Sequence, residues 1–267
     1  MPELTWHSPP LVRASVALHA VALLAVIAKP HWWPWVLAAV VVDHLLVVGV
    51  GLWPRSHWLG PNWTLLPASA RARNEIALTI DDGPDPAVTP QVLDLLDRHA
   101  ARATFFCIGR RAALHPELCR EIVRRGHSVE NHSQRHAHDF SVLGPRRLAR
   151  ELRASQETLT AITGQRPQFF RAPAGLRNLF LAPALARLDL RLISWSARGF
   201  DTRVNDPGRV RNSLLCGLRA GAILLLHDGH AARTPDGSAV ILEVLPKVLE
   251  SAAAAGLRPV TLREAFA

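Results

Sequence analysis

The 267-residue chain is 49% hydrophobic, which is enough for a sizeable core and excludes a disordered protein. It carries a formal net charge of +9, but its basic residues form no stripe with interleaved aromatic residues, so we expect no nucleic-acid binding. Its three cysteines, Cys107, Cys119 and Cys216, lack CxxC and metal-finger spacing, so we expect no disulfide framework and interpret them as small core residues.

Two apolar segments fill the first fifth of the chain. Leu11 to Ala28 has 18 residues and Trp32 to Trp53 has 22, and about 20 are needed to cross the hydrocarbon core of a bilayer. Seven of the eight tryptophans lie in or beside these segments, where indole rings favour the headgroup level. We predict an uncleaved transmembrane hairpin over residues 1–53, with helices at about 11–28 and 32–53. The alternatives are a cleaved signal peptide and buried helices of a soluble protein.

The hairpin places polar residues inside its apolar segments. His19 lies near the middle of the first segment and Asp43 near the middle of the second. Because charged groups at the bilayer centre are costly, they normally find partners. We therefore predict a hydrogen bond between His19 and Asp43 across the hairpin. The alternatives are that Asp43 and His44 face a partner protein or a lipid-carrier phosphate, or that Asp43 is protonated.

Residues 54–73 are rich in proline and predict a linker, and residues 74–267 form the next domain. Short apolar runs there alternate with longer amphipathic ones, which indicates strands and helices of an α/β fold with a parallel sheet closed, or nearly closed, into a barrel. The expected strands are 76–80, 103–108, 127–131, 168–172, 190–195, 222–227 and 258–262. The expected helices are 88–100, 116–125, 145–163, 181–188, 207–220 and 239–255.

Polar residues follow most of the expected strands. In chain order they are Asp81 and Asp82, His132, Arg171, Asp201, and His227 with Asp228. In a parallel barrel, the carboxyl ends of the strands form the rim where catalytic groups converge. We therefore expect these side chains to face one shared site.

The spacing of two histidines points to a metal. His132 and His136 are four residues apart, so on a helical turn both would project from one face. One carboxylate of the Asp81–Asp82 pair would add a third ligand, and two histidines with one carboxylate suit a hydrolytic Zn²⁺ site. The other carboxylate would then be free to take a proton from the attacking water. His138 is a rival ligand, whereas His99, His115, His127 and His230 are expected to be surface or core residues.

Five ordered motifs make the chain recognisable: TIDDGPDP, NHSQRH, FRAPAG, WSARGFDT and LLLHDG. Together they resemble the polysaccharide deacetylases of carbohydrate esterase family four, the NodB-homology domain, over residues 74–267. The resemblance implies a distorted (β/α)7 barrel and metal-dependent hydrolysis of an N-acyl, most often N-acetyl, amide of an amino sugar. Zn²⁺ is the expected metal, and the expected partner is an N-acylated sugar or glycan.

The resemblance also implies roles for individual residues. Asp81 resembles the general base, and Arg171 would hold it by a bidentate ion pair. His227 matches the general acid, and Asp201 matches the acidic residue that tunes it. From its position, Asp228 is expected to support the residues of the site rather than to act as a primary catalyst. The expected metal ligands are Asp82, His132 and His136, and the oxyanion donor would be a backbone N–H within Pro173, Ala174 and Gly175.

Two motifs depart from the family pattern. Asp201-Thr202 replaces a common Asp-Trp pair, and Ala174 replaces a common tyrosine, so an aromatic wall of the sugar groove is missing. With no tyrosine and only Trp195 in the predicted catalytic domain, we expect a small or lipid-linked glycan rather than an extended polysaccharide. A deformylase, an esterase and a catalytically silent glycan-binding scaffold are the alternatives.

The hairpin predicts a multi-pass protein of the bacterial inner membrane. Arg55, Arg71 and Arg73 flank the barrel side, against Lys29 in the hairpin loop, which favours a cytoplasmic barrel by the positive-inside rule. The resemblance favours export instead, so the side of the membrane stays open.

Overall fold

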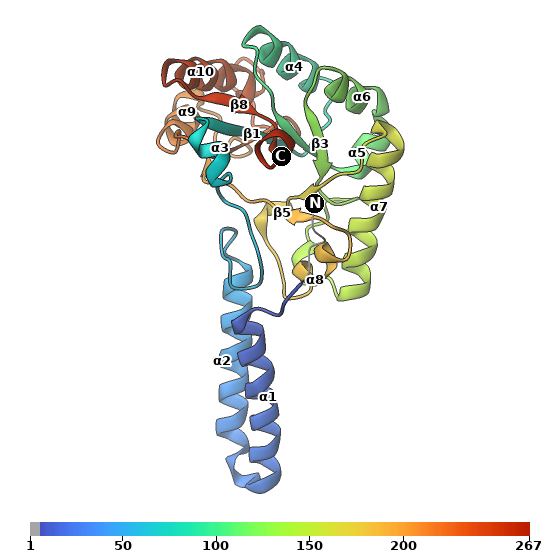
Figure 1. The fold of residues 1–267 in the computed structure, drawn as a ribbon. Coiled ribbons are helices and arrows are strands. Elements are labelled where there is room, and N and C mark those ends of the chain that lie inside the picture. The colour runs from blue at the N-terminus through green and yellow to red at the C-terminus, as the bar shows by residue number, and fades with distance from the viewer. Residues whose placement is uncertain (1–5) are drawn as a thin grey trace.

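Eight short parallel strands form the sheet of this protein in a computed structural model, which describes residues 6–267. The strands are β1 (Glu75–Asp81), β2 (Thr104–Cys107), β3 (Ser128–Asn131), β4 (Phe169–Phe170), β5 (Arg191–Leu192), β6 (Ala197–Arg198), β7 (Ile223–His227) and β8 (Arg258–Val260). The helices are α1 (Pro10–Ala28), α2 (Trp33–Gly51), α3 (Ala68–Ala72), α4 (Thr89–Arg98), α5 (Gly109–Leu114), α6 (Pro116–Arg124), α7 (Pro145–Thr163), α8 (Leu181–Ala186), α9 (Pro207–Leu215), α10 (Val240–Ala254) and α11 (Leu262–Ala265). Figure 1 shows helices surrounding the sheet and the α1–α2 pair projecting from it as a stalk.

The sheet is an open arc. Its strand order is β5-β4-β3-β2-β1-β7-β6, and β8 pairs with the N-terminal residues of β1. Every ladder is parallel. The expected α/β fold with a distorted parallel barrel is confirmed. The barrel stays open between its edge strands, and it has one strand more than expected. The additional strand is β6, which has only two residues and therefore leaves little periodic signal in the sequence.

Strand β1 lies at the centre of the arc and is buried along its whole length. A strand covered on both faces reads as a continuous apolar run, as in the IALTI stretch of this chain. Helices α4, α9 and α10 pack together on one part of the arc, and α5, α6 and α7 on another. Their buried faces supply most of the main hydrophobic core. Of the cysteines, Cys107 and Cys119 are buried as expected, but Cys216 is exposed.

The segment expected to be a linker packs against the barrel instead of spanning open space. Trp63 makes a parallel bridge to Ile193, just beyond β5, and Leu65 makes an antiparallel bridge to Ala222, just before β7. Leu66 is 3% exposed and belongs to a buried cluster. The arc is open between its edge strands β5 and β6, and residues 63–65 partly bridge this opening by linking the end of β5 to the start of β7.

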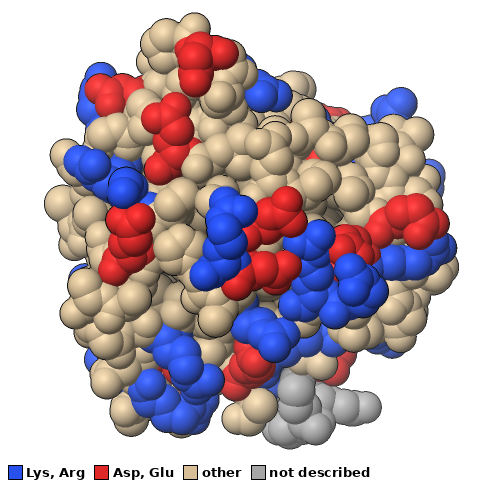
Figure 2. Space-filling view, turned by 90° about the horizontal axis from the view of Figure 1, so that it is seen from above, with Lys and Arg blue, Asp and Glu red and all other residues tan. Residues whose placement is uncertain are grey.

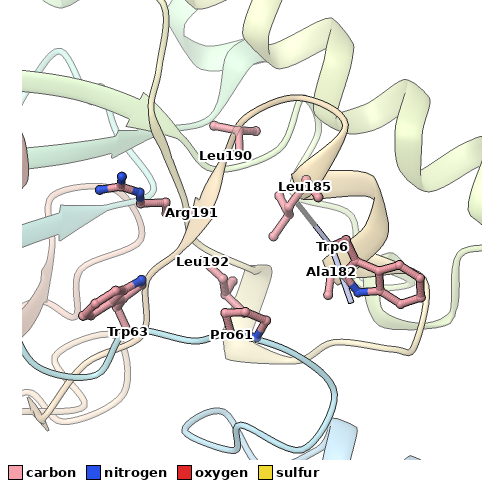
Figure 3. Close-up of a pocket in the computed structure, with 9 residues that line it drawn as sticks. Trp6, Pro61, Trp63, Ala182, Leu185, Leu190, Arg191 and Leu192 are labelled. Carbon is pink, nitrogen blue, oxygen red and sulfur yellow. The ribbon is translucent and has the colours of Figure 1, made fainter. Parts of the chain in front are cut away.

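A small apolar cavity of about 70 Å³ lies where this segment meets β5 (Figure 3). Trp6 lies beside Ala182 and Leu185 in this view, so the chain before α1 also reaches the barrel. The lining residues are Trp6, Pro61, Trp63, Ala182, Leu185, Ala186, Leu190, Arg191 and Leu192. These residues offer one cation and no nucleophile, so we assign the cavity to packing.

Both helices of the stalk are long and apolar enough to cross a membrane, with mean hydropathies of 2.2 and 1.9. His19 and Asp43 lie at the same depth, with His19 Nδ1 4.0 Å from Asp43 Oδ2. The predicted hydrogen bond between them is nevertheless wrong. Asp43 Oδ2 accepts instead from Ser15 Oγ at 2.6 Å, and His19 Nδ1 lies 2.7 Å from the Ser15 carbonyl oxygen. The hydroxyl of Ser15, one helical turn before His19, therefore takes the place predicted for the His19 ring.

The face of the barrel opposite the stalk carries acidic and basic side chains in alternation (Figure 2). Ion pairs account for several surface arginines of the barrel; Arg125, for example, contacts both Asp94 and Asp97. This face therefore shows no extended basic patch despite the net charge of +9.

Candidate active site

The carboxyl ends of the central strands bring the motif residues together. Asp81 ends β1 and pairs in register with His227, which ends β7, and with Phe106 of β2. His132 directly follows β3, and Arg171 directly follows β4. A cavity of about 430 Å³ opens at this edge and is lined by Asp81, Asp82, His132, His136, Ala174, Gly175, His227 and further side chains. The polar residues after four separate strands thus share one site.

Asp82, His132 and His136 form a compact group of three side chains. Asp82 Oδ1 lies 3.2 Å from Nε2 of His132 and 3.2 Å from Nε2 of His136. One donor atom from each of the three side chains lies within 4.8 Å of the other two. Asp82 Oδ1 is buried, and among residues 6–267 it accepts no hydrogen bond. A buried carboxylate oxygen facing two imidazole nitrogens is a donor set that fits a divalent cation.

The orientation of His132 supports the same interpretation. Its Nδ1 lies 2.8 Å from the carbonyl oxygen of Arg171, to which a protonated Nδ1 donates. This hydrogen bond fixes the ring and leaves the lone pair of Nε2 directed at Asp82, as is usual for metal-binding histidines.

The two histidines do not lie on a helical turn, which corrects the reasoning from their spacing. Residues 132–136 form a loop, in which Ser133 and His136 have φ angles of 64° and 52°. The loop is held by the Ser133 N–H, which donates to Asn131 Oδ1, and by the His136 N–H, which donates to Ser133 Oγ. Two left-handed residues turn the chain tightly enough to bring both rings to the same carboxylate.

The charges at this group shift three pKa values. Burial alone would raise the pKa of Asp82, but the imidazoles of His132, His230 and His136 outweigh it and hold the pKa well below its usual range. Burial lowers the pKa of His132, but Asp81 and Asp82 together raise it. Burial and the neighbouring His132 lower the pKa of His136 to about 4. Asp82 is therefore ionised and His136 neutral at pH 7, as metal ligands must be, whereas His132 would release a proton when a cation binds.

Asp81 is held in a different way from its neighbour. Its Oδ1 accepts from Arg171 Nη1 at 2.7 Å, and both side chains are buried. The ion pair is not bidentate as expected, because Arg171 Nε and Nη2 donate to the carbonyl oxygens of Ile193 and Ser194. Asp81 Oδ2 is thereby left facing the three-residue group, 3.8 Å from His132 Nε2.

His227 and Asp201 form a buried pair on the other side of Asp81. His227 Nδ1 lies 2.8 Å from Asp201 Oδ1, and the His227 N–H donates to Asp201 Oδ2 at 2.7 Å. Burial lowers the pKa of His227, but Asp201 and the more distant Asp81 outweigh this and raise it to about 9. The ring is therefore protonated at pH 7 and has a proton to give.

The Pro173–Gly175 segment forms a 3₁₀ turn beside the cavity. Pro173 has no N–H, and the Gly175 N–H donates to Ala172 at 2.7 Å. The remaining N–H of the segment belongs to Ala174, which lines the cavity with a strained φ of 54°. Of the three expected residues, Ala174 is thus the one with an available donor.

His230 lies in the site, although the sequence suggested a surface or core residue. Its Nδ1 is 3.2 Å from Asp82 Oδ2, and its Nε2 is 2.8 Å from Arg111 Nη2. Arg111 Nη1 also donates to the Asp82 carbonyl oxygen at 3.0 Å. Because arginine is only a donor, it fixes the proton of His230 on Nδ1, which donates to Asp82. No sequence motif marks Arg111, but His230 follows the LLLHDG motif by one residue.

Three further residues are placed by the structure. His138 lines the cavity but is not part of the Asp82 group. Asp228 does not line the cavity; it accepts from Thr89 Oγ1 at 2.5 Å and from the Gly229 N–H at 2.9 Å. Trp195 lines the cavity and is 6% exposed.

Comparisons with known proteins agree with this architecture. The sequence model of the polysaccharide deacetylase family matches residues 68–193. The chain is 40% identical over 156 residues to a chitooligosaccharide deacetylase of Bradyrhizobium sp. (strain ANU 289), covering 58% of this chain and 71% of the relative. It is 32% identical over 191 residues to a peptidoglycan-N-acetylglucosamine deacetylase of Bacillus cereus (strain ATCC 14579), covering 71% of this chain and 86% of the relative.

Solved structures show the same fold. A peptidoglycan N-acetylglucosamine deacetylase crystallised with a hydroxamate-type ligand superposes with a TM-score of 0.68 at 27% identity, covering 76% of this chain and 91% of the other. A family 4 carbohydrate esterase from Streptomyces lividans in complex with acetate superposes with a TM-score of 0.63 at 29% identity, covering 69% and 91%. This chain therefore belongs to the polysaccharide deacetylase family, hydrolases that act on carbon–nitrogen bonds other than peptide bonds.

Proposed function

We propose that this protein is a divalent-metal-dependent deacetylase that removes the N-acetyl group from an amino sugar in a membrane-associated glycan. The observation that carries the proposal is that two adjacent aspartates have different partners. Asp82 faces two imidazoles, and Asp81 is paired with a buried arginine and keeps one oxygen free beside them.

Asp82, His132 and His136 would hold the cation, with Zn²⁺ the best match to two nitrogen ligands and one oxygen ligand. When bound, the cation would polarise the amide carbonyl and acidify a water molecule. His230 would orient Asp82 through its second oxygen, so that Oδ1 stays directed at the histidines.

The remaining residues move protons and stabilise charge. Asp81 would take a proton from the attacking water, because Arg171 occupies only its Oδ1. The Ala174 N–H would donate to the oxygen of the former carbonyl as negative charge develops there. His227 would then give its proton to the sugar nitrogen as the carbon–nitrogen bond breaks, which yields acetate and the free amine. Asp201 would keep His227 protonated and correctly turned.

The substrate class follows from the relatives, which are named as deacetylases of chitooligosaccharide and of peptidoglycan N-acetylglucosamine. N-acetylglucosamine or a closely related amino sugar is therefore the proposed substrate. The two long apolar helices support a membrane anchor over residues 1–53, followed by a docked connector (54–73) and a catalytic domain (74–267). On this basis we also propose a multi-pass location in the bacterial inner membrane.

The full-length protein in detergent tests the proposal. Zinc-loaded protein should release acetate from N-acetylglucosamine oligosaccharides, and the Asp81→Asn variant should release it at least about 100-fold more slowly. Formate release from N-formyl sugars but no acetate would favour the deformylase, and faster cleavage of O-acetyl than of N-acetyl sugars would favour the esterase. Binding of every sugar without release of any acid would overturn catalysis and favour the glycan-binding scaffold.

A further inference from the structure

The cavity contains two arginines that the proposed reaction does not use. Arg198 and Arg203 line it together with the metal-binding and acid–base groups. Its two carboxylates are already engaged, Asp81 by Arg171 and Asp82 by histidines. Within residues 6–267, no carboxylate oxygen lies within 4.0 Å of a side-chain nitrogen of either cavity arginine. The mouth of the cavity therefore has an excess of positive charge.

The guanidinium of Arg198 is held in an orientation that suits binding of an anion. Its guanidinium carbon lies 4.2 Å from the ring centre of Phe200 and 5.1 Å from that of Trp195, so two aromatic rings hold it in place. Its Nε is buried and makes no hydrogen bond to any described residue. Burial lowers the pKa of Arg198 more than the nearby carboxylates of Asp201 and Asp81 raise it. A planar guanidinium with free donors suits the oxygens of a phosphate group.

The turn that carries these residues is built in a costly conformation. Phe200 has a φ of 58°, in the left-handed region that bulky residues avoid, and its side chain is 47% exposed at the cavity. The turn is also tightly packed, since a Cβ on Gly199 would meet Val210 Cγ1 at 2.5 Å. Strain that persists in an exposed aromatic residue beside a cavity marks a functional position.

The same mouth lies beside the end of the membrane stalk. The Arg177 N–H donates to the carbonyl oxygen of Gly51, the last residue of α2, at 3.1 Å. Pro54 and Trp195 are neighbours, because a Cβ on Gly175 would meet both of them within 2.7 Å. Ser194 Oγ donates to the Pro54 carbonyl oxygen at 2.7 Å. The loops after β4 and β5 that frame the cavity are thus fixed directly to the barrel-proximal end of α2.

Exposed aromatic side chains lie beside the end of α2 that contacts the barrel. Trp53 and Trp58 are 56% and 57% exposed next to the end of α2, where tryptophan favours the headgroup region. Arg55 Nη1 donates to the Ser196 carbonyl oxygen at 3.4 Å, which places another cation near Trp195. With α1 and α2 in a membrane, the cavity and its unpaired arginines would open at the headgroup level, where a lipid carrier presents its phosphate.

From these contacts we infer that Arg198, supported by Arg203, forms a subsite for a phosphate ester on the amino-sugar substrate. This inference rests on the proposed function and narrows its substrate class to sugars that carry a phosphate near the N-acetyl group. The phosphate would belong either to a soluble sugar phosphate or to a lipid carrier in the membrane, and the position of the cavity favours the lipid carrier.

Binding to a catalytically silent protein tests this subsite separately from turnover. Full-length, zinc-loaded Asp81→Asn protein would be titrated with N-acetylglucosamine 1-phosphate and with methyl N-acetylglucosaminide, which lacks the phosphate. The same titrations follow in Arg198→Gln, Arg198→Lys and the control Arg209→Gln, which removes an exposed arginine outside the cavity. Zinc content checks that each variant is folded at the site.

Arg198→Gln should weaken binding of the phosphate sugar about 10-fold or more and leave that of the methyl glycoside within about 2-fold. Arg198→Lys should recover part of the loss, and Arg209→Gln should change neither. Equal losses for both sugars, or equal affinity of the parent for both, would overturn the subsite even if acetate release is established. Repeating the titration with N-acetylglucosamine linked through phosphate to a polyprenol in phosphatidylcholine vesicles separates the sources. Tighter binding there identifies the lipid carrier, and equal binding identifies the soluble phosphate.

Discussion

Two adjacent aspartates face one cavity because the backbone changes conformation between them. In a regular strand, neighbouring side chains point to opposite faces of the sheet. Asp81 is the last residue of β1, whereas Asp82 has a φ of 71°, and both line the cavity. The left-handed residue breaks the alternation at a cost of order 1–3 kcal/mol. The two carboxylates then meet different partners, so one stays available as a base while the other faces the histidines.

The first prediction separates these two carboxylates. Asp81→Asn should retain zinc and lose at least about 100-fold in turnover, because an amide cannot accept the proton. Asp82→Asn should bind zinc at least about 10-fold more weakly, because the charged ligand is gone. Zinc content by mass spectrometry and acetate release would be measured on the same samples. Equal zinc affinity in the two variants would contradict the assignment.

The second prediction concerns the pH dependence set by His227. A general acid must be protonated, and the pKa of His227 is about 9, so kcat/KM should fall as the pH rises through about 9. In Asp201→Asn the strongest raising charge is removed, Asp81 still raises the pKa and burial still lowers it, so this fall should shift to lower pH. An alkaline limb that stays at the same pH in Asp201→Asn would show that another group donates the proton.

The loops after the strands, rather than the strands themselves, build the site. The sequence predicted regular elements well where local signals are strong: α7 has the expected bounds, with Pro145 at its start and Gly164 at a φ of 70° just past its end. It also placed the motif residues at strand ends. The loop of residues 132–136 and the contact of His230 with Asp82 were not predictable, because they depend on positive φ angles and on distant partners.

Backbone strain is the signal that links these loops. Nine non-glycine residues of the described chain have positive φ angles. Six of them line the cavity or lie between two of its histidines: Asp82, Ser133, His136, Ala174, Phe200 and His230. Asp and His adopt positive φ more often than most residues, but the sequence does not show which of them do so, because tertiary contacts hold these conformations. A sequence therefore reveals which residues are present at the rim but not how the loops turn them.

The third prediction tests the loop after β7. His230→Phe should lower zinc affinity several-fold, because Asp82 Oδ2 loses the donor that orients it. Enzyme saturated with zinc should keep turnover within about 3-fold, since His230 does not take part in proton transfer. His115→Phe changes a histidine outside the cavity and serves as the control. Unchanged zinc affinity in His230→Phe would remove the positioning role.

On the scale of the whole molecule, the stalk and barrel form one unit through the end of α2. Gly51 is in direct contact with the barrel, since a Cβ there would meet the Arg177 carbonyl oxygen at 2.3 Å. Arg177 also donates to the Ser56 carbonyl oxygen, and Asn62 donates to the carbonyl oxygens of Pro54 and Ser56. The cavity is therefore held at a set position relative to the barrel-proximal end of the stalk.

The fourth prediction uses two glycines of α2 as a matched pair. Gly51→Val should push α2 away from Arg177 and make residues 52–63 more sensitive to limited proteolysis, because the connector loses its contacts. Gly49→Val adds the same side chain where nothing lies within 4 Å, so its proteolysis should match the parent. Identical digestion of both variants would mean that the stalk is not docked.

The most direct test of metal-dependent deacetylation is to titrate zinc into metal-stripped full-length protein while measuring acetate release from an N-acetylglucosamine oligosaccharide. Turnover should be absent without metal, rise in proportion to zinc and level off once the group formed by Asp82, His132 and His136 is filled. Full turnover by the stripped protein, or a plateau unrelated to bound zinc, would contradict the account.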